Sequence, residues 1–194
     1  GSYMLDTSVV TLAEIMRDNG YLTAAFVSSF ILDKRFGLDQ GFAAYDDKMD
    51  KFMGPVVMFK GAVRQANKVT DKAIKWLQHN KDKKFFLWVH YYDPHQDVSP
   101  PSPYKEIYKD NLYDGEIAFA DEHIGRLLTR LKKLNLKEKT LIVFCSDHGE
   151  SFGEHGEYSH GMFVYDTTLK VPLILTYPKL IPQGKVIGIM GPSG

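Results

Sequence analysis

Histidine and acidic residues gather in two short segments of the 194-residue chain, and each segment directly follows an apolar run. Five of the seven histidines lie in these segments: His90 and His95 in the first, and His148, His155 and His160 in the second. The second segment also contains Asp147 and several glycines. A carboxylate beside an imidazole can ligate a divalent cation, and glycines let the backbone approach a bound ligand closely. The second segment therefore has the composition of a metal and anion site.

A polar turn with solvated acids and histidines has the same composition, and an isolated Asp-His pair favours that simpler interpretation. The position of both segments in the sequence favours the metal and anion site over a polar turn. Asp147 and His148 directly follow the apolar run 140–145, and the first histidine segment directly follows the apolar run 85–89. In open α/β sheets, ligands bind beyond the carboxyl ends of the strands. We therefore expect both segments at one edge of a sheet.

The elements that would position these segments alternate between strands and helices. Apolar runs predict strands over residues 22–27, 85–89, 140–145 and 171–176, with a weaker candidate over 185–190. Helical spacing predicts helices over 9–19, 61–79 and 111–134, and residues 28–51 have the character of a long loop. The apolar side expected for the third helix consists of Ile117, Ala120, Ile124, Leu127, Leu128 and Leu131. Continuously apolar strands predict an α/β fold, with a mainly parallel sheet and helices on both faces.

Bulk composition fits one soluble globular domain. Hydrophobic residues make up 44% and charged residues 25%, and 24 basic residues balance 24 acidic ones. Nothing in this balance indicates nucleic acid or a membrane surface as a partner. No apolar run reaches the about 20 residues of a membrane-spanning helix. The start of the chain, Gly1 to Met4, resembles a remnant of cloning.

Several motifs resemble the sulfatase family of the alkaline-phosphatase-like superfamily. Residues 140–149, T-L-I-V-F-C-S-D-H-G, with the His155-Gly156 and His160-Gly161 pairs, resemble the second metal-binding segment of that family. Residues 85–95 resemble its apolar strand ending in a Pro-His pair, and residues 113–117 resemble its intervening helix. The resemblance implies a sulfatase-like but incomplete catalytic domain over residues 5–187, followed by a tail, 188–194, that departs from the family pattern.

The resemblance implies that Asp147 and His148 ligate a divalent cation. Calcium is the expected cation, because it is usual in this family. The family often has Asn where His148 stands, and an imidazole there leans away from a purely hard-oxygen site and leaves a transition metal possible. Magnesium, manganese and zinc are the alternatives.

The other histidines receive roles by the same resemblance. His95 would contact the sulfate group or donate to the leaving oxygen. His160 occupies a region where many relatives place a substrate-binding lysine, so it joins His95 as a catalytic candidate. His90 and His155 are substrate-binding candidates, and hydrogen bonding within their own loops is the alternative for both.

The family nucleophile is a formylglycine made from Cys or Ser in a Cys-x-Pro-x-Arg-like motif, and the chain has no such motif. Its single cysteine, Cys145, excludes an intrachain disulfide and precedes Ser-Asp-His without the proline and arginine. We expect Cys145 to be a buried, inert strand residue. The chain is therefore expected to lack the N-terminal nucleophile segment and to be inactive alone.

The function expected of the parent protein is metal-dependent hydrolysis of small-molecule or glycan sulfate esters. A phosphatase, phosphodiesterase or phosphotransferase of the same superfamily is one alternative, because these enzymes share the Asp-His segment. A non-catalytic sulfatase-like module that binds a metal or an anion is another. The resemblance also suggests a periplasmic or secreted protein, although the sequence itself leaves the location unknown.

Overall fold

The computed structural model describes residues 4–49, 63–95, 99–156 and 163–180. The chain divides into two compact units, residues 1–130 and 131–194. None of the helices in the described ranges is long and apolar enough to cross a bilayer.

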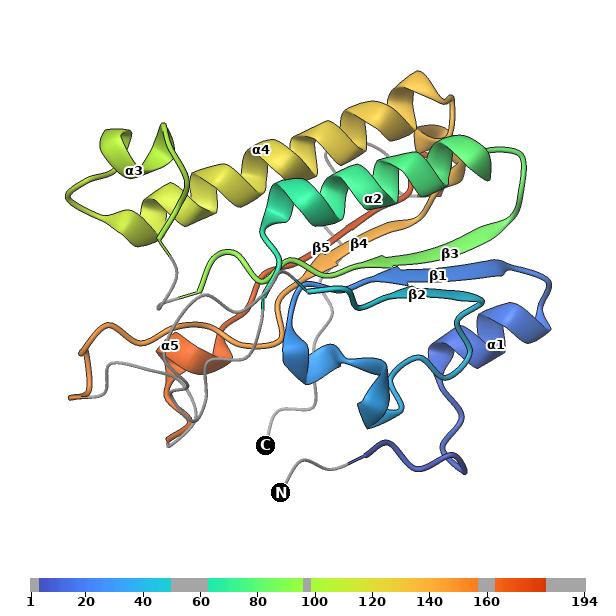
Figure 1. Ribbon diagram of the computed structural model, residues 1–194, viewed down its shortest axis with the longest axis horizontal. Coiled ribbons are helices and arrows are strands. Elements are labelled where there is room, and N and C mark those ends of the chain that lie inside the picture. The colour runs from blue at the N-terminus through green and yellow to red at the C-terminus, as the bar shows by residue number, and fades with distance from the viewer. Residues whose placement is uncertain (1–3, 50–62, 96–98, 157–162, 181–194) are drawn as a thin grey trace. The chain divides into compact units, whose positions relative to one another are not determined.

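The first unit is built on a parallel three-stranded sheet in the order β2-β1-β3 (Figure 1). β1 spans Leu22–Phe26, β2 spans Ala44–Asp46 and β3 spans Phe85–Val89. Helix α1 (Leu12–Asp18) lies on one face of the sheet and α2 (Ala66–His79) on the other. The expected α/β architecture is confirmed, and β3 has the predicted bounds.

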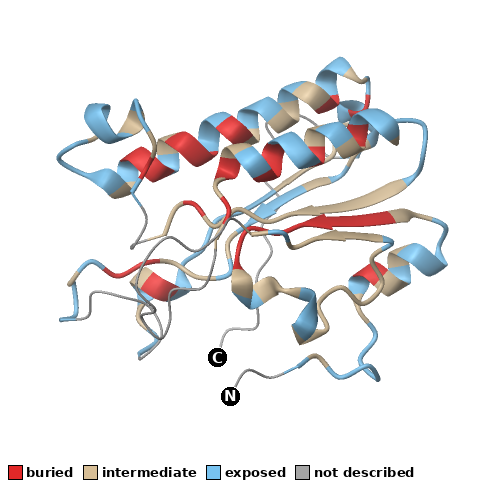
Figure 2. Ribbon diagram, viewed as in Figure 1, coloured by how far each residue is buried: buried red, intermediate tan, exposed pale blue. Residues whose placement is uncertain are grey.

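Both faces of the central strand are covered, which explains why its sequence does not alternate. Ala24 and Phe26 pack against Val69 and Ala73 of α2, and Leu127 of the third long helix joins this core. On the other face, Phe42 stacks against Phe86 and Trp88, with ring centroids 5.8 and 6.1 Å apart. β1 is consequently the most continuously buried strand of this sheet (Figure 2).

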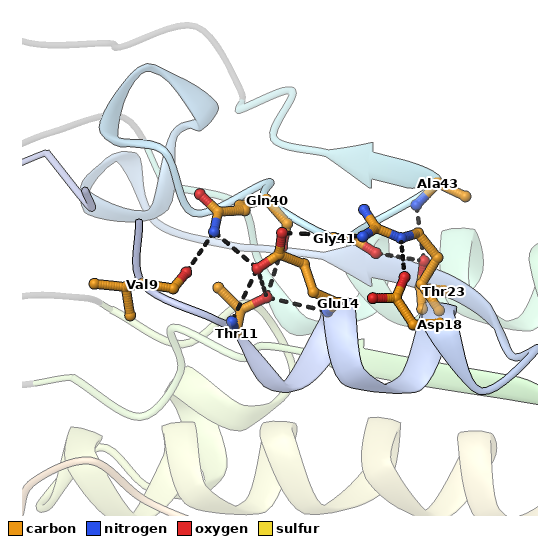
Figure 3. Close-up of polar contacts among 9 residues, drawn as sticks. Val9, Thr11, Glu14, Asp18, Thr23, Gln40, Gly41 and Ala43 are labelled. Carbon is orange, nitrogen blue, oxygen red and sulfur yellow. Dashed lines mark hydrogen bonds and ion pairs between the residues drawn. The ribbon is translucent and has the colours of Figure 1, made fainter. Parts of the chain in front are cut away.

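Helix α1 begins at Leu12, later than predicted, because Thr11 forms a reciprocal cap with Glu14. Thr11 Oγ1 accepts from Glu14 N, and the Glu14 carboxylate accepts from Thr11 N (Figure 3). Gln40 joins this cap, since its Nε2 donates to Glu14 Oε2 at 2.8 Å. The loop before β2 is thereby tied to the start of α1.

Gly41 is required where this loop meets α1, because its φ is +87° and a Cβ there would lie 2.4 Å from Glu14 N. We expect Gly41→Ala to lower the free energy of unfolding by about 1–2 kcal/mol for the left-handed backbone and by about 1–3 kcal/mol more for the clash. Gly20→Ala is the matched control, because Gly20 has φ +81° but open space around its Cβ position. Equal losses in urea denaturation of the two variants would contradict the steric argument.

The prediction of a long loop over residues 28–51 is wrong in part. This segment contains the 3-10 turns η1 (Phe30–Leu32) and η2 (Lys34–Phe36), and then strand β2. β2 has only three residues and gains its partners by pairing with β1, from Ala24 opposite Ala44 to Phe26 opposite Asp46. A strand this short has no apolar run to identify it in the sequence.

The longest helix, α4 (Leu112–Lys133), matches its predicted range closely, but its buried side differs in part. It follows a short helix, α3 (Tyr104–Ile107). Ile117 was expected on the apolar side and is 44% exposed. Ala120 and Leu131 are buried as expected, and the buried stripe of α4 also includes Glu116, Phe119 and His123. Glu116 and His123 are polar, so a hydropathy pattern cannot place these two on the buried side.

In the second unit, β4 (Ile142–Cys145) pairs antiparallel with β5 (Leu173–Thr176). The unit also contains η3 (Lys137–Lys139) and α5 (Asp166–Leu169). The expectation that β4 and Cys145 are buried is wrong: Val143 is 52% exposed, and Cys145 is exposed as well. Within the described part of the chain β4 pairs with β5 alone, and two strands cannot cover each other's faces. The strand expected over residues 185–190 lies outside the described residues.

Candidate functional site

Asp147 and His148 lie side by side directly after β4. His148 Nδ1 is 2.8 Å from the carbonyl oxygen of Gly149. Because a carbonyl oxygen only accepts, Nδ1 must carry the hydrogen, which leaves the lone pair of the neutral ring on Nε2. That nitrogen is 3.9 Å from Asp147 Oδ2.

This arrangement has the donor chemistry that a divalent cation requires. Ligands about 2.0–2.6 Å from one ion can be separated by such a distance. A metal-binding histidine typically donates its other ring N–H to a carbonyl or carboxylate, as His148 does. The Asp147 side chain is 77% exposed and can turn toward an ion. In the described ranges no cluster of three or more His, Cys, Asp and Glu residues has metal-binding geometry, so this pair could supply only part of a ligand set.

The turn that presents His148 is fixed by Gly149. Gly149 N donates to Thr168 O at 2.8 Å, and a Cβ on Gly149 would lie 2.1 Å from Thr167 O. Only glycine allows this close approach to α5. Glu150, next in sequence, has a buried side chain, and its Oε1 is 3.7 Å from His148 Nδ1. The backbone after β4 is therefore held against α5 at the position where the two candidate ligands project.

The two substrate-binding candidates have different surroundings. His155, in the second unit, is exposed and stacks on Tyr165 with ring centroids 4.1 Å apart. His90, in the first unit, links the ends of β1 and β3: Ser28 N donates to its Nδ1 at 3.3 Å, and Ser28 Oγ donates to its carbonyl at 2.5 Å. These bonds join His90 to the end of β1 and not to its own loop, and its assignment as a substrate-binding residue stays a prediction.

The catalytic candidate His95 lies in the loop after β3, in the first unit. Its ring stacks on Tyr92, with centroids 4.4 Å apart and planes at 17°. Its backbone N–H donates to Glu116 Oε2 at 2.9 Å. The other catalytic candidate, His160, lies outside the described residues. The prediction that these two histidines face the Asp147–His148 pair therefore stays a prediction.

Two buried carboxyl groups around His95 were missed by the sequence analysis. Asp93 accepts from Ala66 N at the start of α2 at 2.7 Å, and burial raises its pKa to about 6. Burial raises the pKa of Glu116 to about 8, and the nearby charge of Asp93 adds to this shift. The available signals were the position of Asp93 in the segment that follows a strand and the helical spacing of Glu116 with Ala120 and His123.

A buried arginine, Arg64, was also missed, and it joins the ends of β1 and β2. Its guanidinium donates to Asp46 Oδ1 and Val27 O at 2.5 Å each, and to Asp46 O at 3.0 Å. Burial alone would raise the pKa of Asp46, but the bonds from Arg64 hold it below its usual value. Arg64 therefore stabilises the edge of the sheet at which the strands end.

Comparison with known proteins gives one family. The family model described as Sulfatase matches residues 5–193. The N-acetylglucosamine-6-O-sulfatase of Bacteroides thetaiotaomicron is 40% identical over 81 residues, which are 42% of this chain and 14% of that protein. A protein solved in complex with its substrate, D-glucosamine-2-N,6-O-disulfate, superposes with a TM-score of 0.74 at 18% identity, over 94% of this chain and 58% of that one.

A third similar protein is named for a different activity. The phosphonate monoester hydrolase of Agrobacterium radiobacter superposes with a TM-score of 0.71 at 20% identity, over 92% of this chain and 54% of that one. The chain thus spans little more than half of these solved structures, and identities this low show the fold alone. The fold is the alkaline-phosphatase-like fold of sulfatases, represented in part. Because the family model covers nearly all of its residues, the chain belongs to the sulfatase family.

Proposed function

We propose that the protein to which this chain belongs hydrolyses sulfate esters with the help of a divalent cation, and that Asp147 and His148 are two ligands of that cation. The observation that supports this proposal is the paired geometry after β4, where Gly149 fixes the ring hydrogen of His148 on Nδ1 and leaves Nε2 near Asp147. Calcium is the cation we favour, with magnesium, manganese and zinc as alternatives. A bound cation would polarise a sulfate oxygen and stabilise negative charge on the nucleophile.

Other residues of this chain are candidates for protonating the leaving group and for binding the substrate. His95, in its protonated form, would donate to the leaving oxygen of the ester, and His160 would hold the sulfate group. His155 is exposed and stacked on Tyr165, which suits contact with the organic part of a substrate. The nucleophile would be a formylglycine, and its motif is not among these 194 residues. Relatives named for N-acetylglucosamine 6-O-sulfate and glucosamine disulfate make a glycan sulfate ester the substrate class we favour.

Hydrolysis of a phosphate or phosphonate ester is the second candidate, since a phosphonate monoester hydrolase shares the fold. A charged, tetrahedral oxyanion ester and a polarising cation are common to both reactions. A protein that only binds a cation or an anion is the non-enzymatic candidate. Substrate preference separates the first two, and any cation-dependent turnover excludes the third.

The test uses the full-length protein with matched p-nitrophenyl esters of sulfate, phosphate and phenylphosphonate. We expect the highest kcat/KM with the sulfate, loss of activity after chelation, and recovery with added calcium. Asp147→Ala and His148→Ala should each lower kcat/KM at least about 100-fold, since even residues supporting a metal ligand contribute 10–100-fold.

Asp166→Asn is the control for these variants. Asp166 belongs to the same unit, is largely exposed and pairs with Lys170. Loss of an exposed ion pair costs about 0–1 kcal/mol of stability, so we expect kcat/KM to stay within about fivefold of wild type. A preference for phosphonate or phosphate would move the assignment to the second candidate. Full activity in both the Asp147 and His148 variants would exclude them as ligands.

A further inference from the structure

The loop that contains His95 is held by two buried carboxyl groups. Asp93 ties its first part to the start of α2 by accepting from Ala66 N at 2.7 Å. Glu116, from α4, reaches His95 itself and accepts from its backbone N–H at 2.9 Å. Asp93 is 3% exposed and Glu116 is fully buried, so neither bond competes with solvent.

We propose that Glu116 is a positioning residue that sets the placement of His95 through its backbone amide. The proposal deepens the proposed function and rests on it for the catalytic importance of His95. The contact between Glu116 and the His95 loop is independent of that function. The carboxyl group of Glu116 on α4 is a buried acceptor, and it fixes the loop after β3 by its bond to the backbone N–H of His95.

A simple packing role does not explain a carboxyl group at this position. Among the described residues, the second oxygen, Oε1, has no hydrogen-bond partner, although that oxygen is buried. Burying a polar atom without a partner costs free energy, and an apolar side chain of similar size would avoid this cost. Phe119 and Ala120 show that the same stripe of α4 accepts apolar residues. What the carboxyl adds is the bond to the amide of His95.

The charge state of Glu116 gives this contact a measurable signature. Asp93 and His95 both lie on the facing loop, and the charge of Asp93 opposes ionisation of Glu116. Burial is the larger cause of the raised pKa, about 8. The carboxyl is therefore neutral near pH 7 and ionises in mildly basic solution. Ionisation strengthens its acceptor character, so the amide of His95 should report it.

The experiment is a pH titration by NMR of the 194-residue chain with labelled histidine and glutamate. We expect the backbone amide and imidazole nitrogens of His95 to shift with an inflection near pH 8 that coincides with the side-chain carboxyl carbon of Glu116. Glu116→Gln keeps a carbonyl acceptor but cannot ionise, so the inflection should disappear while the amide stays protected from hydrogen exchange. Glu116→Leu removes the acceptor, and exchange of the His95 amide should accelerate at least tenfold. Asp121→Asn, an exposed change on the same helix, should alter neither measurement.

The result that overturns the proposal is a His95 titration without the Glu116 inflection, together with unchanged exchange in Glu116→Leu. If Glu116→Leu does not fold, the wild-type titration tests the proposal without any variant, and absence of the Glu116 inflection at His95 then overturns it. In the full-length protein, Glu116→Leu should lower kcat and change KM little. Glu116→Gln should retain most of the wild-type kcat near pH 7. A positive NMR result in a protein without sulfatase activity would refute the proposed function and leave the positioning of His95 by Glu116 intact.

Discussion

The purified 194-residue chain will not hydrolyse aryl sulfates above the rate in buffer. Sulfate-ester hydrolysis by this family's chemistry requires a nucleophile, a cation that stabilises its charge and a donor to the leaving oxygen. The chain has candidates for the donor and for two metal ligands. Its single cysteine, Cys145, lacks the proline and arginine of the family motif. These groups act together, and removing the nucleophile alone abolishes most of the rate enhancement. We therefore expect the activity of the chain to be many orders of magnitude below that of an intact sulfatase.

The measurement is release of a chromogenic phenol from an aryl sulfate with calcium, magnesium or manganese present. The full-length protein assayed in parallel is the positive control. Turnover by the 194-residue chain that disappears in His148→Ala would show that the nucleophile is among these residues. Turnover that persists in His148→Ala would point to a contaminating enzyme.

Arg64→Met will destabilise the first unit strongly. The variant leaves the mostly buried carboxylate of Asp46 and the carbonyl of Val27 without the guanidinium that satisfies them. Removing one partner of a buried ion pair typically costs about 3–5 kcal/mol. The arginine also bonds the ends of two strands, so its loss should loosen the edge of the sheet at which the His90 loop begins.

Lys72→Met is the matched control for Arg64→Met. Lys72 Nζ is 3.5 Å from Asp46 Oδ2, but its side chain is 52% exposed. An exposed pair contributes about 0–1 kcal/mol, so the control should stay near wild type in urea denaturation. Similar losses in the two variants would show that burial does not distinguish these interactions. Because the folded state lowers the pKa of Asp46, its contribution to stability should be present above pH 3.8 and lost as the pH falls through the folded value.

Much of the fold follows from residue patterns that the packing enforces. β3 is predicted with its observed bounds, because five bulky apolar residues are flanked by lysines on one side and by histidine on the other. α4 is predicted to within a residue at each end, since its length and charge order are unambiguous. β2 is not predictable in this way, because its three residues are stabilised by pairing with β1 and not by their own hydropathy.

The candidate site likewise has residues that the sequence predicts and residues that it does not. Asp147 and His148 are adjacent in sequence and follow an apolar run, so their closeness could be inferred from the chain alone. Glu116 and Arg64 are charged residues in buried positions, opposite to what hydropathy suggests. Each is stabilised by backbone groups distant in sequence: Glu116 by the His95 amide, and Arg64 by the Val27 carbonyl. Contacts of this kind become visible only when the elements are placed in space.

The exposure of Cys145 makes this chain convenient for spectroscopy. It is the single thiol and lies two residues before Asp147, so a maleimide or methanethiosulfonate reagent would place one label beside the candidate ligands without further mutagenesis. A nitroxide attached there would be broadened by a manganese ion bound within a few residues and unaffected by a diamagnetic one. Occupancy of the Asp147–His148 pair could thus be followed directly, by a signal that requires neither substrate nor turnover.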